Sequence, residues 1–113
     1  MPAQELIGMS LADLADAYAS RNLSPVEVVN DVLTHAEAVN GSINALFSFR
    51  PEQAIASARQ SEARWKAKAA LGPLDGVPMT VKDSVTMVGW PYFHGIGTQI
   101  GRASCRERVL VTV

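Results

Sequence analysis

The chain has few of the residues that form covalent cross-links or metal clusters. Its 113 residues include one cysteine, Cys105, which excludes a disulfide framework and a cysteine-based metal cluster. No apolar run approaches the length of about 20 residues that a membrane-spanning helix needs. The N-terminus has no basic stretch followed by an apolar one, so we expect no secretory signal. The net charge of −1 favours neither nucleic acid nor an anionic membrane as a partner. We therefore expect a cytoplasmic protein with neither of these partners.

The length is that of one small domain, and the chain is rich in signals for helix ends. Ser10 and Ser24 are expected N-caps, and Ser24 is followed by Pro25 and Glu27 at the first and third helical positions. Apolar residues then recur at helical spacing. The pattern predicts helices from Ser10 to about Arg21, from Pro25 to just before Asn40-Gly41, and from Pro51 to about Leu71. It predicts a short strand or extended segment over 43–49 and a strand over 77–81. This order is typical of the opening of an α/β domain.

Residues 72–84 read GPLDGVPMTVKDS, and this segment carries one lysine, Lys82. Glycine and proline make a turn at 74–76, and the strand predicted after it would place Lys82 at its end. A lysine acts as a base only if burial or neighbouring groups make enough of it neutral near pH 7. Most lysines are exposed, so spacing alone favours a solvated Lys82 over a catalytic one.

The segment 72–84 resembles the N-terminal motif of the amidase signature family, in which Gly-x-Pro leads through a strand to Lys-Asp. The helical run LADLADAYASRNLSPVEVVNDVLTHAEAVNGSINAL is similar to the same family, so the likeness covers about residues 5–95. It implies a mixed β-sheet covered by helices, of which this chain would hold the first helices and strands. Gly76, Pro78 and Asp83 match as structural supports, and Lys82 matches the catalytic lysine.

The resemblance also implies a mechanism. Family members use a serine nucleophile, a second serine with a cis peptide bond, and the lysine as the ultimate base, without cofactor or metal. Both serines belong to a glycine-rich segment downstream of the lysine. Ser84, Thr86 and Ser104 have no such surroundings. We therefore expect a truncated, inactive chain that carries only Lys82 of the triad.

The last residues differ in character from the others. Residues 1–99 hold seven Lys and Arg against ten Asp and Glu, whereas residues 100–113 hold three Arg against one Glu. Residues 100–109 read IGRASCRERV, which matches one reading frame of a common short-read sequencing adapter. We therefore divide the chain into residues 1–99, the N-terminal part of an amidase domain, and residues 100–113, a non-native tail.

Other motifs carry less weight. Gly95, Gly97 and Gly101 do not have the spacing of a dinucleotide-binding fingerprint. His35 and His94 lack partners at metal-ligand spacing, and His35 is expected on a helix surface or in a last helical turn. The aromatic residues near Trp90 resemble a segment that lies near the substrate channel in many amidases, although core packing is the favoured role for most of these rings.

Our hypothesis from the sequence is a fragment of an amidase that hydrolyses small-molecule carboxamides, with Lys82 as base and no cofactor. A homodimer is one form that we consider for the parent enzyme. One alternative is a fragment of the amidase subunit of a glutamyl-tRNA(Gln) amidotransferase, which needs partner subunits. An alternative of another class is a non-catalytic helical interaction module in which Lys82 is only structural.

Overall fold

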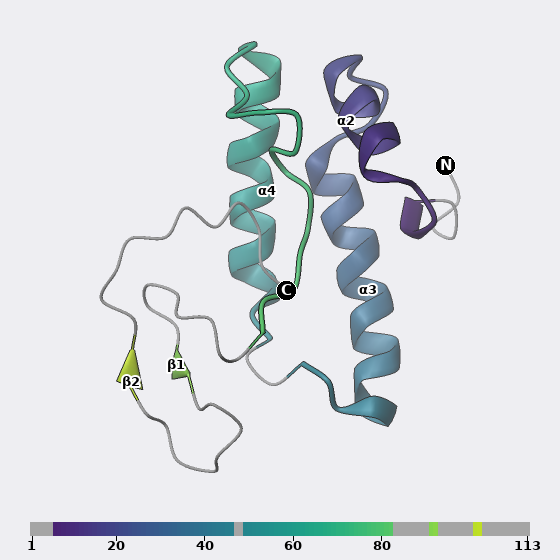
Figure 1. Ribbon diagram of the computed structural model, residues 1–113, viewed down its shortest axis with the longest axis vertical. Coiled ribbons are helices and arrows are strands. Elements are labelled where there is room, and N and C mark those ends of the chain that lie inside the picture. The colour runs from purple at the N-terminus through teal and green to yellow at the C-terminus, as the bar shows by residue number, and fades with distance from the viewer. Residues whose placement is uncertain (1–5, 47–48, 83–90, 93–100, 103–113) are drawn as a thin grey trace.

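The structure is a computed structural model that describes residues 6–46, 49–82, 91–92 and 101–102. Its main elements are three helices, α2 (Leu11–Ala19), α3 (Pro25–Ile43) and α4 (Pro51–Lys66). Two short strands, β1 (Pro91–Tyr92) and β2 (Gly101–Arg102), pair antiparallel, with Pro91 opposite Arg102. Figure 1 shows α3 and α4 running side by side in opposite directions, with α2 beside the start of α3. No helix in the described part of the chain is long and apolar enough to cross a membrane.

The starts of α2 and α3 confirm the predicted caps. The Ser10 hydroxyl accepts a hydrogen bond from the Asp13 N–H at 3.1 Å. Ser24 forms a full capping box, in which its hydroxyl accepts from the α3 backbone and its own N–H donates to the Glu27 carboxylate at 2.9 Å. These bonds satisfy N–H groups that the first turn of a helix leaves without intrahelical partners.

The predicted end of α3 is wrong by four residues. The helix continues through Asn40 and Gly41 to Ile43, and Asn44 ends it in the left-handed conformation at φ 48°, which asparagine tolerates well. The Asn40 side chain bonds instead to the chain beyond the helix, accepting from the Leu46 N–H at 2.8 Å and donating to its carbonyl at 3.0 Å. Asn40 therefore organises the turn after α3 without ending the helix.

The two predicted strands are not formed in the described residues. Ile43 is helical and 44–46 carry no regular structure, while 47–48 lie outside the described residues. Between 77 and 82 the only β feature is an isolated bridge at Met79. A strand requires a neighbour for its backbone groups, and Pro78 has no N–H to offer one. The helical part of the fold is therefore established, whereas the α/β class is not.

Helix α4 ends at Lys66, five residues before the predicted end at Leu71. Its last turn is a Schellman motif, with the Ala69 N–H bonded to the Arg64 carbonyl at 2.8 Å and the Lys68 N–H to the Trp65 carbonyl at 3.2 Å. Lys68 takes the left-handed position at φ 55°, where glycine is usual. The sequence has no glycine at this position to mark the end of the helix, so the helix predicted from the sequence extends too far.

The Schellman motif yields a stability prediction. A non-glycine residue in the left-handed region costs about 1 kcal/mol or more. Lys68→Gly should therefore raise the free energy of unfolding by about 0.5–1 kcal/mol, after the greater freedom of glycine in the unfolded chain is subtracted. Urea unfolding followed by circular dichroism measures this change. A destabilised variant would show that the Lys68 side chain contributes more than its backbone conformation costs.

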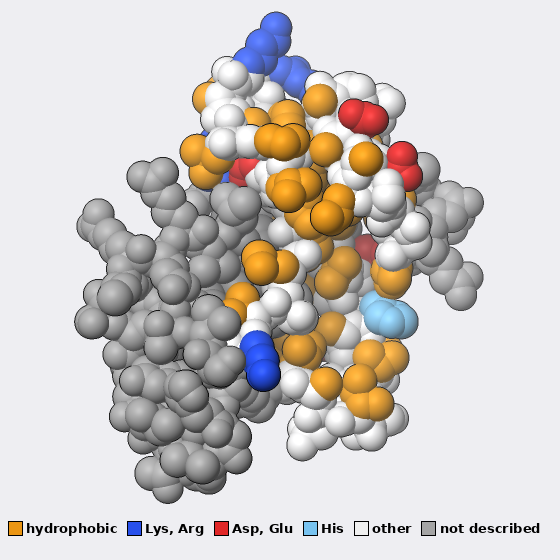
Figure 2. Space-filling view, in the orientation of Figure 1, with side chains coloured by type: hydrophobic (Ala, Val, Ile, Leu, Met, Phe, Trp, Pro, Cys, Tyr) orange, Lys and Arg blue, Asp and Glu red, His pale blue; other side chains and the backbone are white. Residues whose placement is uncertain are grey.

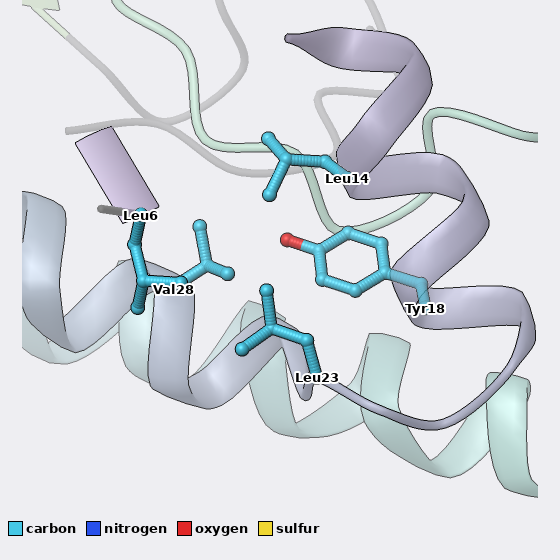
Figure 3. Close-up of a cluster of buried hydrophobic side chains, with 5 residues drawn as sticks. All are labelled: Leu6, Leu14, Tyr18, Leu23 and Val28. Carbon is cyan, nitrogen blue, oxygen red and sulfur yellow. The ribbon is translucent and has the colours of Figure 1, made fainter. Parts of the chain in front are cut away.

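Two apolar clusters hold the helices together. The first contains Leu6, Leu14, Tyr18, Leu23 and Val28, and Trp65 and Val77 pack against it. Figure 3 shows the Tyr18 ring extending from α2 among the other four side chains of this cluster. The second joins α3 to α4 through Val29, Leu33, Ala54 and Ala58. Burial of these apolar surfaces is the main stabilising force available to a chain of this size.

Candidate functional site

The candidate site is the segment that follows α4 and leads to Lys82. In Figure 1 this segment turns back at the end of α4 and runs beside that helix in the direction opposite to it. Its first part, residues 71–77, is bound to α2, α3 and α4 through Asp75 and Gly76, and we call it the anchored turn. Its second part, residues 78–82, is extended and ends at Lys82.

Asp75 is the most heavily bonded residue of the anchored turn. It is 1% exposed, and both carboxylate oxygens accept bonds from Arg64, at 2.7 Å from Nε and 2.7 Å from Nη2. The Ser61 hydroxyl donates to Oδ1 at 2.9 Å, and the Leu71 N–H donates to Oδ2 at 3.1 Å. The two carboxylate oxygens thus accept from four donors, which is how a buried charge becomes tolerable.

The Arg64 guanidinium is the main cause of a lowered pKa for the Asp75 carboxyl group, and the Leu71 N–H and Ser61 hydroxyl act in the same direction, whereas burial opposes them. The folded chain binds a proton on the Asp75 carboxylate less readily than the unfolded chain does. Asp75 therefore stabilises the fold at pH values above the ordinary carboxyl pKa of about 3.9. That contribution disappears as the pH falls through the folded pKa.

We therefore expect the Asp75 carboxyl carbon to titrate below about pH 3.9 in a ¹³C NMR experiment on the folded chain. The stability of the chain should fall with the pH in the same window. A midpoint at or above the ordinary value would contradict the paired, buried carboxylate.

The backbone of the anchored turn is held as firmly as its carboxylate. The Trp65 indole N–H donates to the Asp75 carbonyl at 3.0 Å, and the Tyr18 hydroxyl donates to the Gly76 carbonyl at 3.1 Å. Burial raises the pKa of the Tyr18 phenol, so the hydroxyl keeps its proton and remains a donor. Two aromatic side chains of the helices therefore fix two consecutive carbonyl groups.

Gly76 lies too close to the helices for any other residue. Its φ is +88°, a conformation that favours glycine. A β-carbon at this position would lie 2.5 Å from the Ser61 hydroxyl oxygen and 2.8 Å from two atoms of the buried Pro25 ring. The GPLDGVP sequence thus needs glycine at position 76 for close contact with α3 and α4.

Lys82 is exposed and lies five residues beyond Val77, the last residue of the anchored turn. In the described part of the chain no hydrogen bond or ion pair reaches its ammonium group. Asp83, Ser84, Thr86, Trp90, His94, Ser104 and Cys105 lie outside the described residues, so their predicted roles stay predictions. His35 is exposed on α3, as the surface option predicted, but it lies well before the last turn.

Sequence reasoning missed the residues that hold the turn. An arginine on a helix is usually solvated, and the turn signal at 74–76 gave no reason to pair Asp75 with Arg64. A signal was present for Ser61, because it continues the spacing of the buried Ala54 and Ala58 along one face of α4. A serine on that apolar face needs a polar partner, and Asp75 supplies it.

The described residues contain no group of three or more acidic, His or Cys side chains that could hold a metal ion. They do line a cavity of about 720 Å³ beside the ends of α2 and α4, formed by Ala19, Ser20, Arg21, Trp65, Lys68 and Ala70. Arg21 is engaged there, since its guanidinium donates to the Lys66 carbonyl at 2.7 Å. Figure 2 shows one face of the molecule, on which hydrophobic side chains lie among the polar ones over the helices. Lys82 does not line the cavity.

Comparisons with known proteins agree with the motif. A family model described as Amidase matches residues 27–112. An acylamidase from Rhodococcus erythropolis is 38% identical over 111 residues, which is 98% of this chain and 23% of the relative. A glutamyl-tRNA(Gln) amidotransferase subunit from Nitratidesulfovibrio vulgaris is 41% identical over 87 residues, 77% of this chain and 17% of the relative.

A mitochondrial glutamyl-tRNA(Gln) amidotransferase subunit from Ixodes scapularis is 36% identical over 86 residues, 74% of this chain and 16% of the relative. The chain thus spans less than a quarter of the length of these relatives. No solved structure matches it. The match to the family model covers more than half of the chain, and it includes the anchored turn and Lys82. The chain therefore belongs to the amidase family, the amidase signature family that its Lys82 motif resembles.

Proposed function

We propose that this chain is the N-terminal part of an amidase that hydrolyses small-molecule carboxamides, and that Lys82 is its catalytic base. The observation that carries the proposal is the anchored turn: four side chains from the helices, Tyr18, Ser61, Arg64 and Trp65, bind two residues of the family motif. A motif built only to make a surface turn would not require a buried carboxylate and a buried glycine.

The chemistry follows from the position of Lys82 in the motif. In the proposed reaction a neutral Lys82 amine takes a proton, through the second serine, from the serine that attacks the amide carbonyl. The proton then goes to the leaving ammonia or amine, and water releases the carboxylate. Both serines would come from protein outside this chain, so we propose that the chain alone does not hydrolyse amides. Its full-length form needs no metal or cofactor for these steps.

The proposal is tested in a chimera in which this chain replaces the matched residues of the Rhodococcus erythropolis acylamidase. We expect benzamide hydrolysis in the chimera and a loss of about 100-fold or more with Lys82→Ala, since a general base contributes at least that factor. Lys68→Ala, which removes another exposed lysine, is the matched control and should keep the activity. A Lys82→Ala chimera that is folded and equally active would refute the proposed base.

A second candidate is the amidase subunit of a glutamyl-tRNA(Gln) amidotransferase. It is favoured by relatives described as glutamyl-tRNA(Gln) amidotransferase subunits that are 33–41% identical to this chain. The same exchange made in the Nitratidesulfovibrio vulgaris protein separates the two candidates. Activity restored only in the acylamidase background supports the first candidate, and activity restored only in the amidotransferase background supports the second.

A further inference from the structure

The buried charge pair Arg64–Asp75 is the least expected feature of this small fold. The side chain of Asp75 is 0% exposed and that of Arg64 is 27% exposed. Removing two charges from water is costly, and such pairs are often no more stabilising than apolar residues of the same volume. A second pair on α4, Lys66 with Glu62 at 2.7 Å, is far more exposed. The position of the buried pair therefore calls for a reason other than stability.

The donors around Asp75 require a carboxylate in particular. All four of its partners donate hydrogen bonds: two guanidinium nitrogens, a hydroxyl group and a backbone N–H. A carboxylate accepts on both oxygens, whereas an asparagine amide of the same shape accepts on one side and donates on the other. With asparagine at position 75, the side-chain NH2 group would face the hydrogen-bond donors that now bind one carboxylate oxygen. Only a movement of the turn would separate these donors.

The segment from the anchored turn to Lys82 is short and partly stiff. Val77 packs against the first apolar cluster, and its N–H donates to the Leu74 carbonyl at 3.1 Å. Pro78 follows with its φ fixed by the ring. The five residues that follow Val77 and end at Lys82 span at most about 17 Å when extended. A displacement of the turn is therefore passed on to Lys82 and not absorbed by a long loop.

We propose that Asp75, held by Arg64 and Ser61, is a positioning residue that fixes the turn from which the Lys82 segment departs and so determines where Lys82 lies. Asp75 acts through the backbone, and it does not contact Lys82. The kinetic consequence of this inference rests on the proposed function, whereas the geometric one does not. Misplacing a catalytic group by about 1 Å lowers a rate by about 100-fold.

The geometric test uses the full chain and backbone NMR relaxation. With Asp75→Asn we expect the order parameters of Val81 and Lys82 to fall from about 0.85 to below about 0.6, while α3 keeps its values. Ser61→Ala removes only one of the four bonds to the carboxylate and should lower the same order parameters by a smaller amount. It provides the test if Asp75→Asn does not fold. Leu33→Val is the control, because it loosens the α3–α4 cluster without touching the turn, and it should leave Lys82 unchanged.

The kinetic test uses the acylamidase chimera. Asp75→Asn should lower kcat by about 10- to 100-fold with KM little changed. The kcat of Arg64→Lys should lie between those of Asp75→Asn and the unsubstituted chimera, because lysine keeps the charge but not the bidentate geometry of arginine. Unchanged order parameters at Val81 and Lys82 in both Asp75→Asn and Ser61→Ala would overturn the inference. If the Lys82→Ala chimera keeps its activity, the proposed function fails, and the order parameters still decide the positioning role.

Discussion

Replacing Arg64 by leucine is expected to lower the free energy of unfolding by about 3 kcal/mol, because it leaves the Asp75 carboxylate buried without its cation. Two of the four hydrogen bonds to the carboxylate are lost with the guanidinium group. The remaining donors, Ser61 and the Leu71 N–H, are neutral and cannot replace the charge. Urea unfolding of the full chain, followed by circular dichroism at 222 nm, measures the change.

The matched control lies two residues further along the same helix. Lys66→Leu also removes a cation from a 2.7 Å pair, but the Lys66 side chain is 66% exposed. Exposed pairs contribute about 0.5 kcal/mol or less. Losses of equal size in the two variants would show that Asp75 is not buried in solution. A loss of helix at all urea concentrations in Arg64→Leu alone would agree with the expected result, since small domains have little stability to spare.

Alanine at position 76 is the second substitution with a large expected effect. Its β-carbon would meet Ser61 at 2.5 Å and the Pro25 ring at 2.8 Å, and it would adopt an unfavourable positive φ. Overpacking costs about 1–3 kcal/mol, and the left-handed backbone costs a further 1–2 kcal/mol, roughly. We therefore expect Gly76→Ala to destabilise the chain by about 3 kcal/mol and to detach the turn from Tyr18.

Two other glycines provide the controls for this substitution. A β-carbon at Gly72 or at Gly41 would meet nothing within 4 Å. Gly41 lies inside α3, where alanine is preferred by about 1 kcal/mol, so Gly41→Ala should stabilise the chain. Thermal unfolding of the three variants provides the comparison. A Gly76→Ala variant as stable as Gly72→Ala would contradict the close contact between the turn and α3.

The local signals of the sequence predict the local structure well. Ser24, Pro25 and Glu27 lie within four residues of one another, and the capping box that they form needs nothing from the rest of the chain. The helical spacing of Ala54, Ala58 and Trp65 puts them on one face of α4, and they do face the core. The ends of α3 and α4 were wrong because Asn44 and Lys68 occupy left-handed positions without glycine.

The anchored turn could not be predicted in the same way. Arg64 and Asp75 are separated by 11 residues and a change of chain direction, so no periodic pattern relates them. An arginine on a helix is usually solvated, and Leu-Asp-Gly is usually an ordinary turn. Only the folded structure, in which the turn packs back onto α4, shows that the carboxylate is buried. The family motif located the segment through its resemblance, whereas the structure explains why glycine and a carboxylate are needed in it.

The central claim is that Asp75 and Gly76 are bound to the helices and hold the segment that leads to Lys82. Nuclear Overhauser spectroscopy of the full chain tests it most directly. The account predicts cross-peaks between the Tyr18 ring and Gly76 and between the Trp65 indole proton and Asp75, since the bonded atoms lie 3.1 Å and 3.0 Å apart. Absence of both cross-peaks in a sample that shows contacts between Leu33 and Ala58 would contradict it.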